Sequence, residues 1–519
     1  MDTIEAMKKC FMEANFTMTE APNRKRTRER TRKRPESEGS YRKISQSKWR
    51  RLSSPYQQTG IISEDELESI HNASLRILSE IGIDFLDITA RGILKQHGAI
   101  IEENTERVRF DPAMVLEYVA KAPAEFTLYG GRPERDLTFG GNNINFASIA
   151  SAPFCSDLQG GRRDGNYNDF QNFVRMAQTA NIIHLFGGYP VEPVDLPPQT
   201  RHLDCHYSFL TLSDKVHHAY SLGRQRPSDA IDMLCIARGE TRDSIVDRPG
   251  IHSIINTSSP LRVDSPMLQG LMEMSSHGQA VCVTPFTLSG AMSPVTIAGA
   301  LAQQNAEALA VIAFTQMVRA GAPVIYGGFT SNVDMRSGAP AFGTPEYAKA
   351  VFVGGQLADK YGLPYRSANA NASNAADAQA AWESMMSLWP VVLGHTNLVM
   401  HAAGWMEGGL TASFEKFVID LELLQGMAAF LQPLEINEAS LGLEAIRDVG
   451  PGGHFFGTPH TLERYETAFY QPLLSDWRNY ESWEEAGSPD ALTRANRTYR
   501  ALLEEFEAPP IDPAIDEEL

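Results

Sequence analysis

The chain has 519 residues, and 43% of them are hydrophobic, which is enough to bury the core of one large barrel or of two domains. No run of about 18 apolar residues is present, so a membrane-spanning helix is not expected. The five cysteines are scattered and form no Cys-x-x-Cys pair, which argues against a disulfide framework or a thiolate zinc site.

The N-terminal region is strongly basic, although the formal net charge of the whole chain is −18. Residues 1–23 lack an apolar segment followed by a cleavage site, so we expect a cytoplasmic protein. Between Arg24 and Arg51, 13 Lys and Arg accompany three Glu, a net of +10, so the rest of the chain carries −28. The segment RKRTRERTRKR has no interleaved aromatic residues and no fold signature. We therefore predict a disordered basic arm over residues 1–57 and no nucleic-acid partner.

Residues 58–165 mix short helices with short strands. A helix begins after Ser63, a good N-cap that is followed by three acidic residues in the first turn. The apolar spacing then predicts helices at residues 88–97 and 112–120. Strands are predicted at residues 99–102, 107–110, 126–129 and 144–147. We expect an N-terminal α/β accessory subdomain that packs on or caps the main domain.

From about residue 166, apolar strands alternate with amphipathic helices. The predicted strands cover residues 182–189, 216–222, 251–256, 280–285, 324–329, 365–368 and 398–401. The predicted helices cover residues 202–212, 228–238, 267–274, 297–318, 345–361, 376–388 and 414–430. This alternation predicts an α/β protein with a (β/α)8 TIM-type barrel over residues 166–519, ending in helical segments. Residues 144–147 or 453–457 are the candidates for the eighth strand.

Three of these strands run directly into loops of glycine and uncharged amides, at residues 327–332, 367–374 and 404–409. Because the carboxyl ends of parallel strands meet on one face, these loops predict a small-molecule pocket there. None has the glycine spacing of a phosphate-binding loop. The chain also has no Gly-x-Ser-x-Gly motif, so a hydrolase is not expected.

Aromatic rings, amides and carboxylates recur in and beside these loops. The residues are Tyr326, Phe329, Trp405 and Phe456, the amides Asn332 and Asn374, and the carboxylates Asp334 and Glu407. A pocket of aromatic faces with an acid suits a quaternary ammonium ion, which donates no hydrogen bonds and is held by ring quadrupoles and charge. Taken singly, each aromatic residue is more typical of a barrel core or a subunit interface.

Two histidine patterns resemble metal ligands. His202 and His206 lie four residues apart on one predicted helix, and His217 and His218 are adjacent at a strand start. Without the Glu of a His-Glu-x-x-His motif, such pairs are weak evidence, and we expect no metal site.

Three longer segments resemble the trimethylamine methyltransferase family. They are GGFTSNVDMRSG at residues 327–338, AAGWMEGGLTASFEKF at residues 402–417 and GPGGHF at residues 450–455. The resemblance implies a β/α barrel that moves a methyl group from a methylated amine to the Co(I) of a separate corrinoid protein. It therefore implies a corrinoid carried by a partner, a small methylated amine as substrate, and no metal bound directly by this chain.

The resemblance also bears on the substrate. Archaeal trimethylamine enzymes carry a pyrrolysine at a position that we match to Asn374, and this chain has only ordinary residues there. Relatives without pyrrolysine act on quaternary amines such as glycine betaine. A quaternary nitrogen already carries its charge and leaves as a neutral amine, so a betaine-type substrate is our first hypothesis. A trimethylamine-specific enzyme and a non-catalytic betaine-binding barrel are the alternatives.

The implied roles are mainly binding roles. Tyr326, Phe329, Trp405 and Phe456 are expected to present aromatic faces, with His401 beside them at a strand end. Glu407 or Asp334 would balance the positive charge, and Asn332, Asn374 or Arg366 would hold a substrate carboxylate. Glu407 and Asn374 are our candidate catalytic residues. Barrels with large accessory segments often associate, so we also expect a homo-oligomer.

Overall fold

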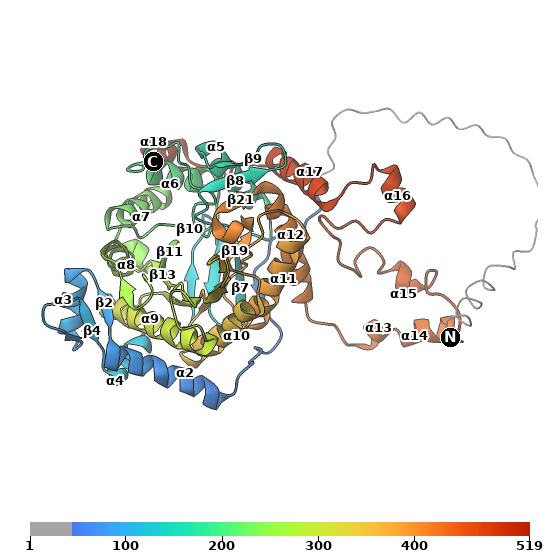
Figure 1. Cartoon of the computed structure of the whole chain (residues 1–519). Helices are drawn as coiled ribbons and strands as arrows, with labels where there is room; N and C mark the ends of the chain where they lie inside the picture. Colours follow the sequence, from blue (N-terminus) through green and yellow to red (C-terminus); the bar gives the residue numbers. More distant parts are fainter. Residues whose placement is uncertain (1–43) are drawn as a thin grey trace, which may run out of the picture. The chain divides into compact units, whose positions relative to one another are not determined.

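A ring of parallel strands forms the centre of the computed structural model, which describes residues 44–519 (Figure 1). Leu185 bridges Ala147 to Val216 and closes this ring as its eighth member. The seven strands of the ring are β7 (Asn143–Ser148), β10 (His217–His218), β11 (Ile251–Ile255), β13 (Ala280–Val283), β15 (Val324–Gly327), β18 (Tyr365–Ala368) and β19 (Leu398–Ala403). The predicted (β/α)8 barrel is confirmed.

The barrel begins earlier in the chain than residue 166. Of the two candidates for the eighth strand, the first is the one that pairs: β7 covers residues 144–147 and lies beside β19, whereas residues 453–457 form no strand. The predicted strand at residues 182–189 contributes only the bridge at Leu185. There Gly187 lets the chain pass close to β7, because a Cβ would lie 2.7 Å from the Ser148 carbonyl oxygen.

Helices surround the ring. They are α5 (Tyr167–Thr179), α6 (Arg201–Leu212), α7 (Gln225–Arg238), α8 (Ser265–Ser276), α9 (Ile297–Val318), α10 (Pro345–Lys360), α11 (Ala378–Leu393) and α12 (Phe414–Phe430). Side chains of Asp264, Thr344 and Asp377 accept bonds from first-turn N–H groups, as N-caps do. α9 is long and apolar enough to cross a membrane, but 83% of its apolar window is buried, which is typical of a core helix.

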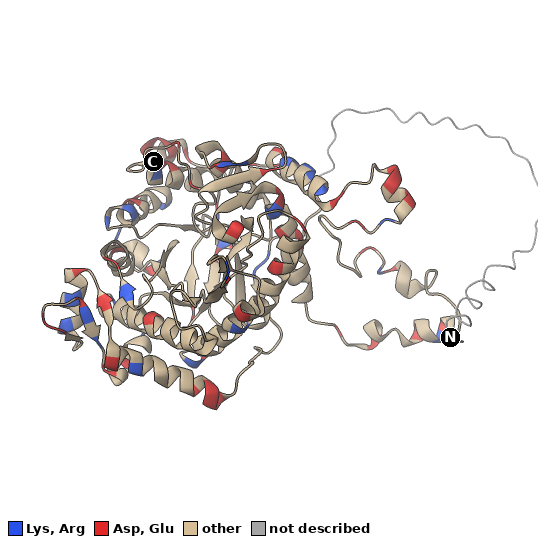
Figure 2. Cartoon of the chain, viewed as in Figure 1, with Lys and Arg blue, Asp and Glu red and all other residues tan. Residues whose placement is uncertain are grey.

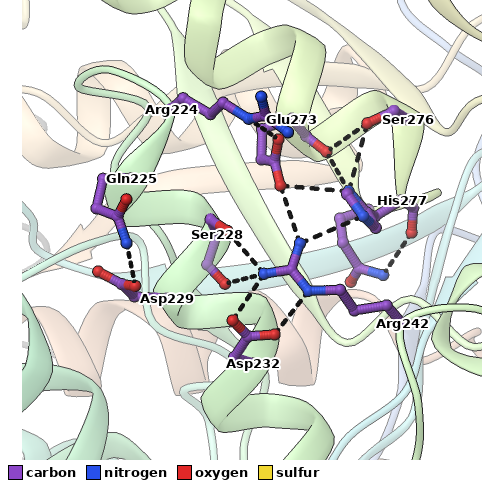
Figure 3. Close-up of polar contacts among 10 residues, drawn as sticks. Arg224, Gln225, Ser228, Asp229, Asp232, Arg242, Glu273, Ser276 and His277 are labelled. Atoms are coloured by element: carbon purple, nitrogen blue, oxygen red, sulfur yellow. Dashed lines mark hydrogen bonds and ion pairs between the residues drawn. The ribbon is translucent and has the colours of Figure 1, made fainter.

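Charged residues lie mainly on the outer helices and few lie on the central strands (Figure 2). One cluster joins α7 and α8 (Figure 3). Arg242 donates to Asp232 at 2.6 Å and to Glu273 at 3.1 Å, and Arg224 donates to Glu273 at 2.8 Å. Because the Glu273 carboxylate is buried and has two arginine partners, this cluster fixes neighbouring crossovers of the barrel.

An accessory layer packs on α9. α2 (Glu64–Arg76) begins with a capping box at Ser63, and both α2 and α4 (Pro112–Val119) contact α9. The other elements of the layer are α3 (Ile88–Gln96) and the sheet of β12 (Arg262–Val263), β2 (Ile83–Phe85), β4 (Arg107–Arg109) and β3 (Ile100–Ile101). The hairpin of β5 (Phe126–Leu128) and β6 (Leu137–Phe139) contacts β7 instead.

Residues 44–57 lie along the barrel, although their composition placed them in the predicted disordered arm. β1 (Leu52–Ser53) pairs antiparallel with β7, and the Arg50 guanidinium donates to the Ala428 carbonyl at 2.8 Å. Leu52 is buried. This basic segment donates hydrogen bonds to backbone carbonyls of the barrel, and its composition alone does not reveal these partners. Residues 1–43 of the predicted arm lie outside the described residues.

The C-terminal region leaves the barrel after α12 and returns to it (Figure 1). Its helices are α13 (Glu438–Leu441), α14 (Leu443–Val449), α15 (Pro459–Leu462), α16 (Tyr480–Glu485), α17 (Ala491–Glu504) and α18 (Pro513–Glu518). α17 packs against α12 and α5, so it closes the barrel wall, whereas the short helices α13 to α16 precede this contact.

Candidate active site

The loops that follow the barrel strands pair with one another at the carboxyl face. β14 (Leu288–Ser289) pairs with β16 (Ser331–Val333), which pairs with β17 (Pro340–Ala341). β20 (Trp405–Met406) pairs with β21 (Thr411–Ser413), which continues to β8 (Phe154–Asp157) and β9 (Gly161–Asp164). The glycine-rich loops thus have fixed backbones, and the side chains that they carry are held in place.

A buried aromatic cluster lies at the centre of this face, around Phe329. The Phe329 ring stacks on Phe342 at 5.2 Å between centroids and contacts Phe286 at 5.2 Å. Trp405 meets Phe329 edge-on at 6.1 Å and lies 4.1 Å from the His401 ring. This arrangement presents several ring faces within one small volume, which is the requirement for binding a cation without hydrogen bonds.

Arg366 adds a buried positive charge to the cluster. It lies on β18, with its guanidinium carbon 5.0 Å from the Phe329 centroid and its Nη1 donating to the Gly328 carbonyl at 3.3 Å. Its Nε has no partner, and none of the carboxylates in residues 44–519 forms an ion pair with it. Burial lowers the pKa of Arg366. An unbalanced buried charge is costly, so an anion beside this guanidinium would lower that cost.

Two amides of the loop after β18 bond to the end of β19 and the segment after it, and Asn371 is the one that holds Trp405. The Trp405 indole donates to the Asn371 carbonyl at 3.0 Å, and the Asn371 side chain donates to the Trp405 carbonyl at 2.8 Å. Asn369 donates to the Ala402 carbonyl at 3.0 Å. The side-chain oxygens of Asn369 and Asn371 are buried without partners. These oxygens are additional acceptors beside the aromatic rings.

His401 is neutral in this environment. Its Nδ1 accepts from the Ala150 N–H at 3.2 Å, which leaves the proton on Nε2. Burial, and next the charge of Arg366, hold the pKa of His401 well below its ordinary value. The ring therefore contributes an aromatic face next to Trp405 without adding a second positive charge.

The sequence matches the family described as trimethylamine methyltransferase (MTTB) over residues 24–519. The chain belongs to this methyltransferase family. It is similar to a glycine betaine methyltransferase of Desulfitobacterium hafniense, with 36% identity over 460 residues, which cover 88% of this chain and 95% of the relative. It is also similar to the trimethylamine methyltransferase MttB1 of Methanosarcina mazei, with 29% identity and coverage of 88% and 93%.

A solved structure also covers most of the methyltransferase. The crystal structure of the Methanosarcina barkeri monomethylamine methyltransferase (MtmB) covers 87% of this chain and 90% of its own, with 9% identity and a TM-score of 0.47. The family assignment comes from the sequence match over residues 24–519.

Glu407 of this methyltransferase already has a positively charged partner. Arg162 donates to its two oxygens at 2.8 and 3.2 Å, and the Thr411 hydroxyl donates at 2.6 Å. Burial alone would raise the pKa of Glu407, but the bonds from Arg162 and Thr411 outweigh burial and lower it. The carboxylate therefore ties the loop after β19 to β9, and its charge is balanced within the chain.

Asn374 lies outside the aromatic cluster. It is exposed, on the loop between β18 and α11. The Glu383 side chain fixes this loop by accepting from the backbone N–H groups of Ala372 and Ser373 at 2.8 and 2.9 Å. The structure therefore gives Asn374 a defined backbone position but no side-chain partner among the residues described.

Four other predicted residues lie away from the cluster, and three of them have hydrogen-bond partners of their own. The Tyr326 hydroxyl donates to Asn305 of α9, and Asp334 accepts from Ser337 within its own turn. Asn332 accepts from Thr344 at 3.0 Å. Phe456 is 84% exposed on the C-terminal segment between α14 and α15. Of the ten predicted site residues, the structure brings Phe329, Trp405, His401 and Arg366 together.

Sequence reasoning did not single out Phe286 or Phe342. Phe342 reaches the cluster because β16 and β17 fold back on each other, which places it on Phe329. Within residues 44–519, no group of three or more His, Cys, Asp and Glu side chains converges. His202 instead contacts Asp229 at 2.8 Å, and His217 packs on Phe209.

Proposed function

We propose that this methyltransferase takes a methyl group from a betaine-type quaternary amine and transfers it to the Co(I) of a corrinoid carried by a separate protein. The observation that carries the proposal is Arg366, a buried guanidinium without a carboxylate partner, in contact with the aromatic cluster. The similarity to a glycine betaine methyltransferase supports the same substrate class.

A betaine has a trimethylammonium group and a carboxylate only one carbon apart. The cluster offers the complementary pair at similarly short range, because Arg366 lies 5.0 Å from the Phe329 ring and Trp405 lies 6.1 Å from it. We assign the carboxylate to Arg366 and the trimethylammonium group to the faces of Phe329, Trp405 and His401. Each desolvated cation–π contact contributes about 1–2 kcal/mol.

The chemistry requires no proton transfer by the protein. Reduced cobalt supplies the nucleophile when the corrinoid partner is bound. The nitrogen keeps the electron pair of the broken C–N bond and leaves as an uncharged amine, so no residue needs to act as an acid or base. The residues here hold the substrate, orient one methyl group outward and exclude water. Because the product amine is neutral, its attraction to the rings weakens and release is favoured.

The barrel mouth has a surface suited to such a partner. Val295, Met335 and Leu410 are exposed on the loops that follow β13, β15 and β19. Val295 and Met335 both lie within 4 Å of the Cβ position of Gly290, so they are close to each other. Exposed apolar side chains around a mouth are typical of a docking site. A corrinoid partner that docks there would bring its cobalt to the face of the barrel at which the cluster lies.

Calorimetry with glycine betaine, choline, tetramethylammonium and trimethylamine tests the proposal, followed by methyl transfer to free Co(I) cobalamin monitored by absorbance. We expect glycine betaine to bind most tightly and to methylate cobalt. Faster transfer from trimethylamine would contradict the assignment of Arg366 as a carboxylate site. Tight betaine binding without cobalt methylation, with the cognate corrinoid protein also present, would make the chain a binding protein.

A further inference from the structure

The chain exposes an unusual amount of apolar surface on one segment, residues 432–472, which we name the C-terminal arm. Leu434 is 83% exposed and Phe469 is 77% exposed. The other large apolar side chains exposed on the arm are Ile436, Leu441, Leu443, Ile446, Phe455, Phe456, Leu462 and Tyr465. These residues are of the kind that the barrel buries.

The arm has no core of its own. Its helices α13, α14 and α15 are four to seven residues long, and none packs extensively on another helix or strand among residues 44–519. Helices this short are not stable in water without tertiary packing. Another surface is therefore needed to cover them.

Both ends of the arm are nevertheless fixed to the barrel. Leu431 is buried at the end of α12. At the other end, the N–H groups of Leu473 and Leu474 donate to the Glu422 carboxylate at 2.7 Å, and Leu474 is buried. The arm is thus a loop with a fixed base rather than a free terminus. Both ends of this base contact α12, through Glu422 and the Leu431 cap.

The exposed apolar area is that of a stable interface. Ten large side chains exposed to this extent present on the order of 1,000 Å², compared with about 800 Å² per partner in a standard protein–protein interface. Single-chain proteins rarely leave a patch of more than a few hundred Å² in water.

A second apolar surface lies on the barrel at the base of the arm. Trp382 is 61% exposed on α11, and Met386 and Trp389 follow it at helical spacing on the same face. Trp389 contacts Phe430 edge-on at 5.0 Å, and Phe430 lies directly before the arm. An apolar stripe on α11 therefore continues through Phe430 into the arm.

We propose that the C-terminal arm docks on the α11 stripe of a second copy of this chain. An exchange of this kind is isologous: each copy offers one arm and one stripe, and a two-fold axis closes the assembly. A second copy fits better than a corrinoid partner. A corrinoid protein must leave and return with each turnover, and the arm would lose its cover every time. The predicted homo-oligomer thus has a defined interface in this proposal.

Sedimentation velocity tests the interface on the full-length chain, without substrate, at concentrations from about 1 to about 50 µM. We expect wild type to sediment as a multiple of 57.3 kDa. Phe456→Asp/Phe469→Asp in the arm and Trp382→Asp/Met386→Asp on α11 should each give a 57.3 kDa species. Ile88→Asp, an equally exposed apolar position on the accessory layer, is the matched control and should leave the assembly unchanged.

Wild-type hydrogen exchange provides a test that does not depend on the folding of a variant. Amides of α13 and α14 should be protected at high concentration and exchange faster on dilution. A wild-type chain that is monomeric over the whole range, or an assembly that survives either pair of substitutions, would contradict the proposal. So would an arm that becomes protected only when corrinoid protein is added. None of these readouts depends on catalysis, so they stand apart from the proposed methyl transfer.

Discussion

Two loops of this chain look alike in sequence and differ completely in structure. The loop at residues 404–409 and the loop at residues 450–457 both combine glycines with large aromatic residues. The first follows strand β19, and its Trp405 is buried against His401 and bonded to Asn371. The second follows helix α14 in the C-terminal arm, and its Phe456 is exposed. The element that precedes a loop, rather than its composition, decides whether its rings reach the barrel mouth.

The barrel and the C-terminal arm also differ in what their stability depends on. The barrel buries its apolar residues together with several histidines, so its stability depends on the protonation state of these buried groups. The arm buries little within one chain, so its stability depends on another surface. We make four predictions about the buried groups and loops of the barrel, and one of them uses the arm for comparison.

Acid should unfold the barrel well before it titrates most carboxylates. Burial lowers the pKa of His184 and His206 to about 3 and that of His252 to about 4. In the unfolded chain these histidines have an ordinary pKa near 6.5, so below that pH the unfolded state binds more protons than the folded state. Each histidine should therefore cost about 2 kcal/mol of the free energy of unfolding at pH 5 relative to pH 7.

Urea unfolding at pH 8, 7, 6 and 5 measures this loss. Stability should be level from pH 8 to 7 and fall steeply below 6.5. His206→Leu removes a buried imidazole whose two nitrogens have no partner, and it should reduce the pH slope by about one proton. A slope unchanged in this variant would show that His206 does not titrate on unfolding.

Arg366→Met should weaken the binding of glycine betaine about 100-fold, because it removes a charge-assisted bond to the carboxylate. Choline has no carboxylate, and its binding should change by less than about threefold. The thermal midpoint should not fall, since the substitution removes a buried charge that lacks a carboxylate partner within the chain. Calorimetry with both ligands measures the difference.

Arg366→Lys is the control for charge alone. Lysine keeps the charge but lacks the planar fork that binds a carboxylate at two points, so its affinity should lie between those of wild type and the Met variant. Equal losses for betaine and choline in Arg366→Met would show that Arg366 positions the aromatic rings rather than the substrate.

Trp405→Leu and Phe456→Leu compare the two aromatic loops directly, and Phe329→Leu adds the ring that Trp405 contacts. Trp405→Leu and Phe329→Leu should raise the KM for betaine about tenfold, because each removes a ring face worth about 1–2 kcal/mol. Phe456→Leu should leave KM and kcat unchanged, since its ring lies on the arm and the substitution keeps an apolar side chain there. Thermal melting of all three variants distinguishes lost binding from lost packing. An effect of Phe456→Leu on KM without a change in assembly would place Phe456 at a catalytic site.

Much of the barrel could be predicted from local sequence. Strands β11, β18 and β19 and the caps of α2 and α10 follow directly from apolar runs and capping residues. The glycine-rich loops after β15, β18 and β19 are expected to meet on one face, and the aromatic cluster lies there. These features depend on residues that are neighbours in the sequence.

The parts that could not be predicted depend on distant contacts. Arg162 lies 245 positions before Glu407 in the sequence, and no local pattern indicates that it balances the charge of this carboxylate. Phe342 joins Phe329 only through the fold of β16 on β17. Whether the Phe456 ring is exposed or buried depends on how the arm that carries it packs. A site assembled from several loops is therefore visible from sequence as a set of residue types, but not as a set of contacts.

The smallest effect is expected for Glu407→Gln. If Glu407 served as the counter-ion of the substrate, this change would weaken betaine binding strongly. Because Arg162 already balances the carboxylate, we expect KM to change by less than about threefold. The ion pair itself is partly exposed and is worth about 0–1 kcal/mol.

Arg162→Gln breaks the same pair from the other side and should have a matching effect on the thermal midpoint. The pKa of Glu407 is lowered from 4.5, so its contribution is complete above that pH and is lost only as pH falls through the lower folded value. The two variants are best compared at pH 7.5, which lies above the pKa of Glu407 and above the pH range in which the histidines titrate. A large loss of betaine affinity in Glu407→Gln, with none in Arg162→Gln, would show that Glu407 contacts the substrate.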